Sequence, residues 1–381
     1  METPQAVLEA GVARGDAPFA VGMVADAAGL RLVAAAGEAA PGRPAGPETV
    51  LRLFSMTKAV AATAALVLAD RGALDLDAPV AAILPDFARV AVLDGWDGET
   101  PRLRPPARPA TVRDLMTHVA GFAYGHWNAD MRRYRKATGL PAMATGKRAA
   151  LFYPMVADPG TAWRYGFGTD WLGLVIEAAA GAPIETVCRE ALLEPLGMRD
   201  TVFDLTPDLR ERLARAWARG EDGGFEPSPI APPEAPEFRG MGDALYGTAA
   251  DYLRFLRLFL GGGAVDGVRV LSEASVAAAL ANQIGGLRVG RMASVAPRIA
   301  ADVELLPGVE MRHSLIGQRS EADAPGRRRA GSSGWAGIMN THWWVDPAAG
   351  VAAVLATQSL PFMEPPFARL YADFERAVYA A

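Results

Sequence analysis

Apolar and polar positions change their pattern in blocks along the chain. Residues 19–35 hold two apolar stretches around a polar, glycine-containing centre, which predicts two strands joined by a tight turn. Residues 50–54 predict a further short strand. From Ser55 to Gly72 the chain has helix formers without Gly or Pro in between, which predicts a helix. Ser55 is therefore expected at a strand-to-helix junction.

The middle of the chain, residues 85–240, has a different pattern, in which Pro and Gly interrupt several helical segments. Its last part, residues 224–240, is Pro-rich and predicts a long surface loop that borders the active site. After residue 240 a helix is expected at 250–262, two buried strands turning at Asp346-Pro347, and a final helix. We predict an α/β fold (α+β), in which residues 1–84 and 241–381 form an antiparallel sheet flanked by helices and residues 85–240 form an inserted, mainly helical domain.

Composition supports a globular enzyme-sized protein and excludes some partners. The 381 residues are 51% hydrophobic and 21% charged, with a net charge of -5. No overall positive field attracts phosphate backbones, so we expect no nucleic-acid partner. The basic run at residues 327–329 is expected to be a solvated loop without a function.

The single cysteine and the absence of long apolar segments give two further expectations. Cys188 lies on the apolar side of a predicted helix and is expected to be a buried, unreactive thiol. The first twenty residues have neither a basic start nor a sustained apolar stretch, and no segment offers about 18 uninterrupted apolar residues. We therefore predict a cytoplasmic protein without a membrane partner; its oligomeric state stays open.

The strongest chemical signal is the S-x-x-K motif formed by Ser55 and Lys58. Residues three apart share one side of a helix, so Lys58 can reach the Ser55 hydroxyl. A serine becomes a good nucleophile when a neighbouring base takes its proton, and a neutral lysine can be that base. With 10 Ser and 3 Lys in the chain, composition alone predicts about 0.08 such pairs. Chance is therefore a poor explanation, although a neutral surface pair stays an alternative.

Around this motif the sequence resembles the serine beta-lactamase-like superfamily, and most of all the class C-like carboxylesterases called family VIII. The resemblance runs through most of the chain, in the expected order, at residues 50–85, 111–122, 163–203, 241–263 and 332–358. It implies a beta-lactamase/transpeptidase-like fold with the active site between the two domains.

The resemblance places Tyr165 at the tyrosine of the family's Y-x-N motif, where it would exchange protons with Ser55 and Lys58 and activate the deacylating water. Phe167 stands where the motif has asparagine, which removes an amide that could bind a polar substrate backbone. This departure speaks against an efficient beta-lactamase or peptidase. The alternative for Tyr165 is simple core packing.

The segment Trp335-Ala336-Gly337 is similar to the W-x-G form of the third motif, which is K-T-G in beta-lactamases. Tryptophan offers an apolar wall where lysine would pair with a substrate carboxylate, so uncharged groups should bind better. By the same register, the backbone N–H groups of Ser55 and Ile338 would form the oxyanion hole. Packing within a strand is the alternative for Trp335.

Aromatic and histidine side chains supply the other candidates. Tyr124 and Trp127 are expected to bind substrate, with His126 between them, although loop aromatics also cover cores. His118 is expected to be structural. No two histidines have the spacing of a zinc site, so we expect no metal and no cofactor.

These residues together predict a serine hydrolase that cleaves small carboxylic esters through an acyl-serine intermediate on Ser55. Three alternatives stay open. The same site could transfer the acyl group to an alcohol, or it could hydrolyse beta-lactams, D-amino peptides or amides. The chain could also be a binding protein that keeps the fold without catalysis, although that function gives no reason to retain Ser55, Lys58 and Tyr165 together.

Overall fold

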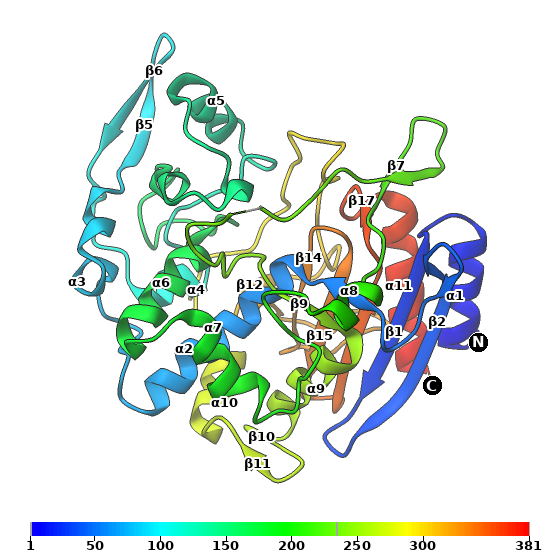
Figure 1. Cartoon of the computed structure of the whole chain (residues 1–381). Helices are drawn as coiled ribbons and strands as arrows, with labels where there is room; N and C mark the ends of the chain where they lie inside the picture. The colour runs from blue at the N-terminus through cyan, green and yellow to red at the C-terminus, as the bar shows by residue number, and fades with distance from the viewer. Residues whose placement is uncertain (1, 234, 381) are drawn as a thin grey trace.

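One antiparallel sheet built from the two ends of the chain organises the molecule (Figure 1). The structure is a computed structural model that describes residues 2–233 and 235–380. The sheet has eight strands in the order β12 (Met311–His313), β13 (Gln318–Ser320), β14 (Ser333–Gly337), β15 (Thr341–Asp346), β16 (Val351–Ala356), β1 (Phe19–Ala25), β2 (Leu30–Ala40) and β3 (Arg43–Pro44). Every neighbouring pair in it is antiparallel.

Helices cover both faces of this sheet, and the sequence of β15 shows why. Side chains alternate between the faces of a strand. Accordingly Trp343 packs against Tyr252 of helix α9 (Ala249–Leu260), whereas its neighbour Trp344 packs against Tyr371 and Phe374 of helix α11 (Pro365–Ala380). Helix α1 (Pro4–Ala13) lies beside α11, so both chain ends lie on the same side of the sheet (Figure 1).

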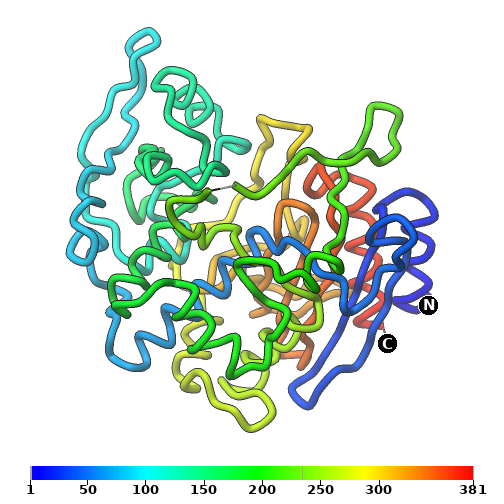
Figure 2. The backbone as a smooth tube through the Cα atoms, viewed as in Figure 1, coloured from blue at the N-terminus to red at the C-terminus, as the bar shows by residue number. Residues whose placement is uncertain are grey.

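Most of the remaining helices belong to the middle of the chain. Figure 2 shows its cyan part on the side away from the two chain ends, whereas its later green part runs back toward them. Its helices are α3 (Val80–Ile83), α4 (Val112–Met116), α5 (Ala129–Thr138), α6 (Gly168–Ala180), α7 (Ile184–Cys188) and α8 (Pro207–Glu211), with 3₁₀ turns at Pro85–Arg89, Met143–Thr145 and Arg148–Phe152 and a π turn at Arg189–Leu193. Strands β5 (Val92–Asp97) and β6 (Thr100–Arg104) form a short pair. Strand β7 (Trp217–Arg219) lies between β8 (Phe225–Pro227) and β17 (Ser359–Leu360) in a small three-stranded sheet.

The remaining elements connect this region to the sheet. They are β4 (Val50–Arg52), the helix α2 (Thr57–Asp70), β9 (Tyr246–Thr248), β10 (Ala264–Val265), β11 (Val268–Arg269) and α10 (Glu273–Leu280). Helix α2 contacts α6, α7 and α10 and is buried around most of its circumference.

The main elements expected from the sequence are confirmed: the hairpin of β1 and β2, the strand β4, the helices α2, α9 and α11, and the buried pair β15 and β16. Cys188 is buried in α7 as expected. The division at residues 84 and 241 stays a prediction. Among the described residues no single helix is long and apolar enough to cross a membrane; only the bent pair of Gly168–Ala180 and Ile184–Leu193 meets that test jointly.

The expectation of a solvated loop at residues 327–329 is wrong for Arg327 and Arg328, whereas Arg329 is exposed. Arg328 is 2% exposed and Glu375 of α11 is fully buried, and Arg328 Nε lies 2.7 Å from Glu375 Oε1. Arg327 binds the same carboxylate, and Arg328 also donates to the Tyr371 hydroxyl. Sequence could not show this, because the partner lies 47 residues away on the last helix. Arg327, Arg328 and Glu375 together fasten α11 to the loop that precedes β14.

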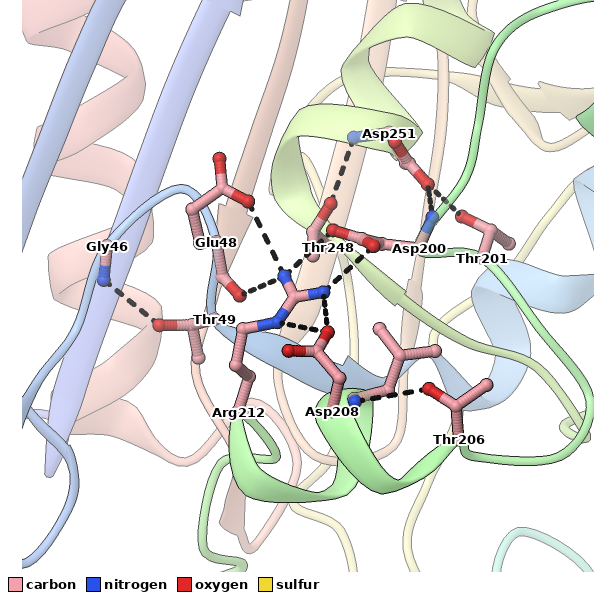
Figure 3. Close-up of polar contacts among 11 residues, drawn as sticks. Gly46, Glu48, Thr49, Asp200, Thr201, Thr206, Asp208, Arg212, Thr248 and Asp251 are labelled. Carbon is pink, nitrogen blue, oxygen red and sulfur yellow. Dashed lines mark hydrogen bonds and ion pairs between the residues drawn. The ribbon is translucent and has the colours of Figure 1, made fainter.

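A second polar cluster lies beside the segment that precedes β4 (Figure 3). Arg212 donates to both carboxylate oxygens of Asp200, at 2.8 and 2.9 Å, and to Asp208 at 2.8 Å, and it also reaches Glu48. Nearby, Asp251 of α9 accepts hydrogen bonds from Asp200 N and the Thr201 hydroxyl. The cluster joins the segment before β4 to the segments before α8 and α9.

Replacing Glu375 by Gln is expected to lower the free energy of unfolding by about 3–5 kcal/mol, because it leaves the Arg328 charge buried without a counter-charge. Urea denaturation measures this change. The control is Arg189→Ala, which breaks ion pairs whose side chains are at least half exposed and should cost at most about 1 kcal/mol. Equal effects of the two variants would contradict a stabilising role of the buried pair.

Candidate active site

Ser55 lies in a 3₁₀ turn, Phe54–Met56, between strand β4 and helix α2. Strand β4 pairs with β9, and Phe54 adopts a left-handed backbone conformation with φ 47°. Such a conformation is unfavourable for a residue with a side chain and persists where the surroundings impose it. The sharp turn presents the Ser55 hydroxyl at the start of the helix, as the sequence predicted.

Lys58, one turn further along, has all three of its hydrogen-bond donors engaged. Its Nζ lies 3.0 Å from Ser55 Oγ, 3.0 Å from the Tyr124 hydroxyl and 2.8 Å from the Gly242 carbonyl oxygen. The side chain is only 4% exposed. A lysine ammonium carries three N–H donors and no acceptor, so this arrangement satisfies it completely. Lys58 is thus fixed beside the hydroxyl that it would activate.

Two tyrosines flank Lys58 in different ways. The Tyr124 hydroxyl accepts its hydrogen bond, whereas Tyr165 presents its ring to Lys58, with Nζ 5.2 Å from the ring centre. The Tyr165 hydroxyl instead accepts a hydrogen bond from Trp335 Nε1 at 2.9 Å. Burial above all raises the pKa of Tyr124 well above its ordinary value, and nearby Asp170 raises it further. The sequence placed Tyr165 in the proton relay and Tyr124 in substrate binding; the direct contact with Lys58 belongs to Tyr124.

Strand β14 comes very close to the Ser55 turn. A Cβ atom on Gly337 would lie 2.4 Å from the Leu53 carbonyl oxygen and 2.4 Å from the Thr341 hydroxyl oxygen. Thr341 in turn donates to the Leu53 carbonyl. Only glycine permits this approach, which brings Ile338 and Ser55 to the wall of one cavity.

That cavity has a volume of about 1520 Å³, and Ser55 is among the residues that line it. Six predicted site residues besides Ser55 line it: Tyr124, Trp127, Tyr165, Trp335, Ala336 and Ile338. Most of the other lining is apolar, from Met131, Leu140, Met143, Phe203, Phe238 and Phe362. The Pro-rich segment contributes Ile230, Ala231, Pro232, Pro233 and Pro236, so the expectation that it borders this site is confirmed. Phe167 also lines the cavity, where an asparagine would have added a polar group.

The histidines take different positions around the site. His126 lines the cavity, stacked on Tyr124, and burial lowers its pKa to about 4. His118 lies behind Tyr165 and beside His313, and burial lowers the pKa of both. His342 is stacked on Phe362 and Phe367, away from Ser55. In the described part of the chain no three His, Cys, Asp or Glu side chains are arranged to hold a metal ion.

Three groups next to Lys58 were missed by sequence reasoning: Asp170, Asp243 and the Gly242 carbonyl. Burial, and after it the neighbouring Asp243, raises the pKa of Asp170 to about 7. The side chain of Asp243 is open to the cavity, yet desolvation raises its pKa as well. No sequence motif could identify a backbone carbonyl. To predict Asp170 and Asp243 from the sequence, one would have to know that α6 and the segment before β9 converge on Lys58.

The model of the family described as Beta-lactamase matches residues 5–377 of the chain. The chain belongs to this family. Its beta-lactamase/transpeptidase-like fold, with an antiparallel sheet and flanking helices, is the fold that the sequence predicted.

Several known proteins are similar to this member of the beta-lactamase family. Protein Rv1367c of Mycobacterium tuberculosis is 32% identical over 84% of the chain and 80% of its own length. The monacolin J acid methylbutanoyltransferase of Aspergillus terreus is 29% identical, with 88% and 83% covered. The lovastatin esterase of Penicillium rubens is also 29% identical, with 88% and 86% covered. Among solved structures, unliganded simvastatin synthase (LovD) from Aspergillus terreus superposes with a TM-score of 0.85 at 27% identity, covering 99% of this chain and 97% of that one.

Replacing Gly337 by Ala is expected to push β14 away from the Ser55 turn, because the added methyl group overlaps a backbone oxygen. Such overpacking costs about 1–3 kcal/mol of stability. A fluorophosphonate probe should react with Ser55 about 10- to 100-fold more slowly, which labelling time courses measure. Gly290→Ala is the control, since nothing lies within 4 Å of its added Cβ; wild-type-like labelling of Gly337→Ala would show that the close approach is unimportant.

Proposed function

We propose that this protein is a serine esterase and acyltransferase that carries the acyl group of a carboxylic ester on Ser55. The observation that carries the proposal is that Ser55 lines a large cavity and that its Oγ lies 3.0 Å from the buried Lys58 Nζ. A serine next to a base in a cavity is the arrangement that acyl transfer requires. The esterase and acyltransferase names of two relatives support it.

In the first half of the reaction, Lys58 acts in its neutral form, in which Nζ accepts the Ser55 hydrogen bond instead of donating it. Ser55 Oγ attacks the ester carbonyl carbon, and its proton passes to the Lys58 amine. The backbone N–H groups of Ser55 and Ile338 stabilise the negative charge on the carbonyl oxygen. The bond from that carbon to the alcohol oxygen then breaks, and the alkoxide takes the proton. Tyr124, whose hydroxyl is hydrogen-bonded to Lys58, passes protons between Lys58 and the departing oxygen. Tyr165 faces Lys58 with its ring and holds its hydroxyl toward Trp335, so its part is to stabilise the Lys58 charge as it forms.

In the second half, water or an alcohol attacks the acyl carbon and gives its proton to the same lysine and tyrosine groups. The bond between Ser55 Oγ and the acyl carbon breaks, and Ser55 recovers its proton. Water gives hydrolysis and an alcohol gives acyl transfer, so one site supports both reactions.

The cavity favours a bulky, largely uncharged substrate. Its volume of about 1520 Å³ exceeds the roughly 300–1,000 Å³ of ordinary small-molecule pockets. Trp335 and Phe167 make the wall near Tyr165 apolar. We therefore propose that larger esters or acyl acceptors are used in addition to the small esters expected from the sequence.

Ser55→Ala is expected to abolish hydrolysis of p-nitrophenyl butyrate, by up to about 10⁶-fold, because no other nucleophile replaces it. Peptide mass spectrometry should locate a fluorophosphonate adduct on Ser55. Retained turnover in a clean Ser55→Ala preparation would refute the mechanism. Faster turnover of a chromogenic cephalosporin than of the ester would instead favour the beta-lactamase alternative, and no label with no turnover would favour a binding protein.

Lys58→Ala and Tyr124→Phe are each expected to lower kcat, by about 10³-fold or more for Lys58 and less for Tyr124, and their effects should not add, since the two groups act as one unit. Steady-state kinetics of the single and double variants measure this. Lys147→Ala is the matched control: it removes a half-exposed lysine paired with Glu237 on the surface. Additive losses would show that Tyr124 acts independently of Lys58.

A further inference from the structure

Two carboxyl groups beside Lys58, those of Asp170 and Asp243, take no part in the proposed reaction. Asp170 lies in the first turn of α6 and is 5% exposed. Its Oδ1 accepts a hydrogen bond of 2.7 Å from the Gly242 N–H. The carbonyl oxygen of the same glycine accepts the 2.8 Å hydrogen bond from Lys58 Nζ. Asp170, Gly242 and Lys58 thus form a continuous chain that ends at Ser55.

Gly242 is tightly enclosed in this chain. An added Cβ would lie 2.9 Å from Asp170 Oδ1 and 3.0 Å from the Tyr124 hydroxyl oxygen. The turn that contains it is closed by hydrogen bonds from Asp243 N and Ala244 N to the Gly240 carbonyl. After the turn, β9 pairs with β4, the strand that leads to Ser55. The Gly242 carbonyl is therefore held from one side by β9 and from the other by Asp170.

We propose that Asp170 is a positioning residue, which holds Gly242 so that its carbonyl keeps Lys58 Nζ beside Ser55 Oγ. This rests on the proposed function of Ser55 and Lys58. Asp170 lies at the wall of the cavity, and its Oδ1 accepts the Gly242 N–H rather than the Ser55 hydroxyl. Its contribution is geometric, through a backbone carbonyl that would otherwise be free to turn away from Lys58.

The charge of Asp170 has a second consequence. Facing it are Lys58 from α2, Tyr124 from the loop before α5, and Asp243 from the Gly242 turn, with Arg52 of β4 near Asp243. Because burial and Asp243 raise its pKa to about 7, Asp170 gains its negative charge as the pH rises through neutrality. A carboxylate beside a lysine favours the ammonium form, which cannot accept the Ser55 proton. Removing that charge should let Ser55 become reactive at lower pH.

Two variants separate the geometric contribution from the charge. Asp170→Asn keeps an oxygen that can accept the Gly242 N–H but loses the charge, whereas Asp170→Ala loses both. The rate of fluorophosphonate labelling at Ser55, measured from pH 5 to 9, should fall about 10- to 100-fold for Asp170→Ala at its plateau, as loss of a hydrogen bond to a charged group implies. Asp170→Asn should stay within about 10-fold of wild type, and its profile should shift to lower pH.

The matched control is Asp251→Asn. Asp251 is a half-buried carboxyl whose pKa burial raises to about 6. It accepts hydrogen bonds from Asp200 N and the Thr201 hydroxyl (Figure 3), but it is not among the residues that line the cavity. Its labelling rate and pH profile should match wild type even where its unfolding midpoint changes. Equal labelling of Asp170→Ala and wild type, or equal losses in Asp170→Ala and Asp170→Asn without a pH shift, would overturn the proposal.

Wild-type protein without label at Ser55 would refute the proposed function instead. The positioning role would then be decided by a crystal structure of Asp170→Ala, in which the contact between the Gly242 carbonyl and Lys58 Nζ should be lost. An unchanged contact would overturn the proposal independently of activity.

Discussion

The buried Lys58 side chain is the interaction on which the site depends. A lysine ammonium is costly to remove from water unless each of its donors finds an acceptor. Here the acceptors are the Ser55 hydroxyl, the Tyr124 hydroxyl and the Gly242 carbonyl, which come from three separate segments of the chain. Satisfying one cation therefore brings α2, the loop before α5 and the segment before β9 together.

The rest of the fold holds those segments in place. Strand β9 pairs with β4, and β14 lies against the Ser55 turn at a distance that only a glycine at position 337 allows. Further out, Arg328 and Glu375 fasten the last helix to the sheet. Buried polar groups cost energy, but their hydrogen bonds are directional and therefore fix the relative position of two elements. Hydrophobic contact alone is not directional and does not fix that position.

The cavity beside Lys58 combines this rigid site with an adaptable wall. Its apolar lining comes largely from loops, and the Pro-rich segment forms one side, whereas helix α5 adds Met131 and four basic side chains. Binding surfaces carried on loops tolerate sequence change without disturbing the scaffold. The relatives of this chain include one protein named as an esterase and one named as an acyltransferase, and a wall that can change without disturbing the scaffold is compatible with such differences.

The sequence by itself determined the local elements and singled out Ser55 as the candidate nucleophile. Strand alternation, the uninterrupted helix after Ser55 and the spacing of Ser55 and Lys58 are short-range properties, and the motifs around Tyr165 and Trp335 lie in order along the chain. The tertiary structure decided which groups meet. That Tyr124 contacts Lys58 directly, that Tyr165 binds Trp335, that the arginines at 327–328 are buried and that Asp170 holds Gly242 all depend on residues dozens of positions apart. Hydrogen bonds and buried charges at such separations arise from the packing of whole elements, which no local pattern encodes.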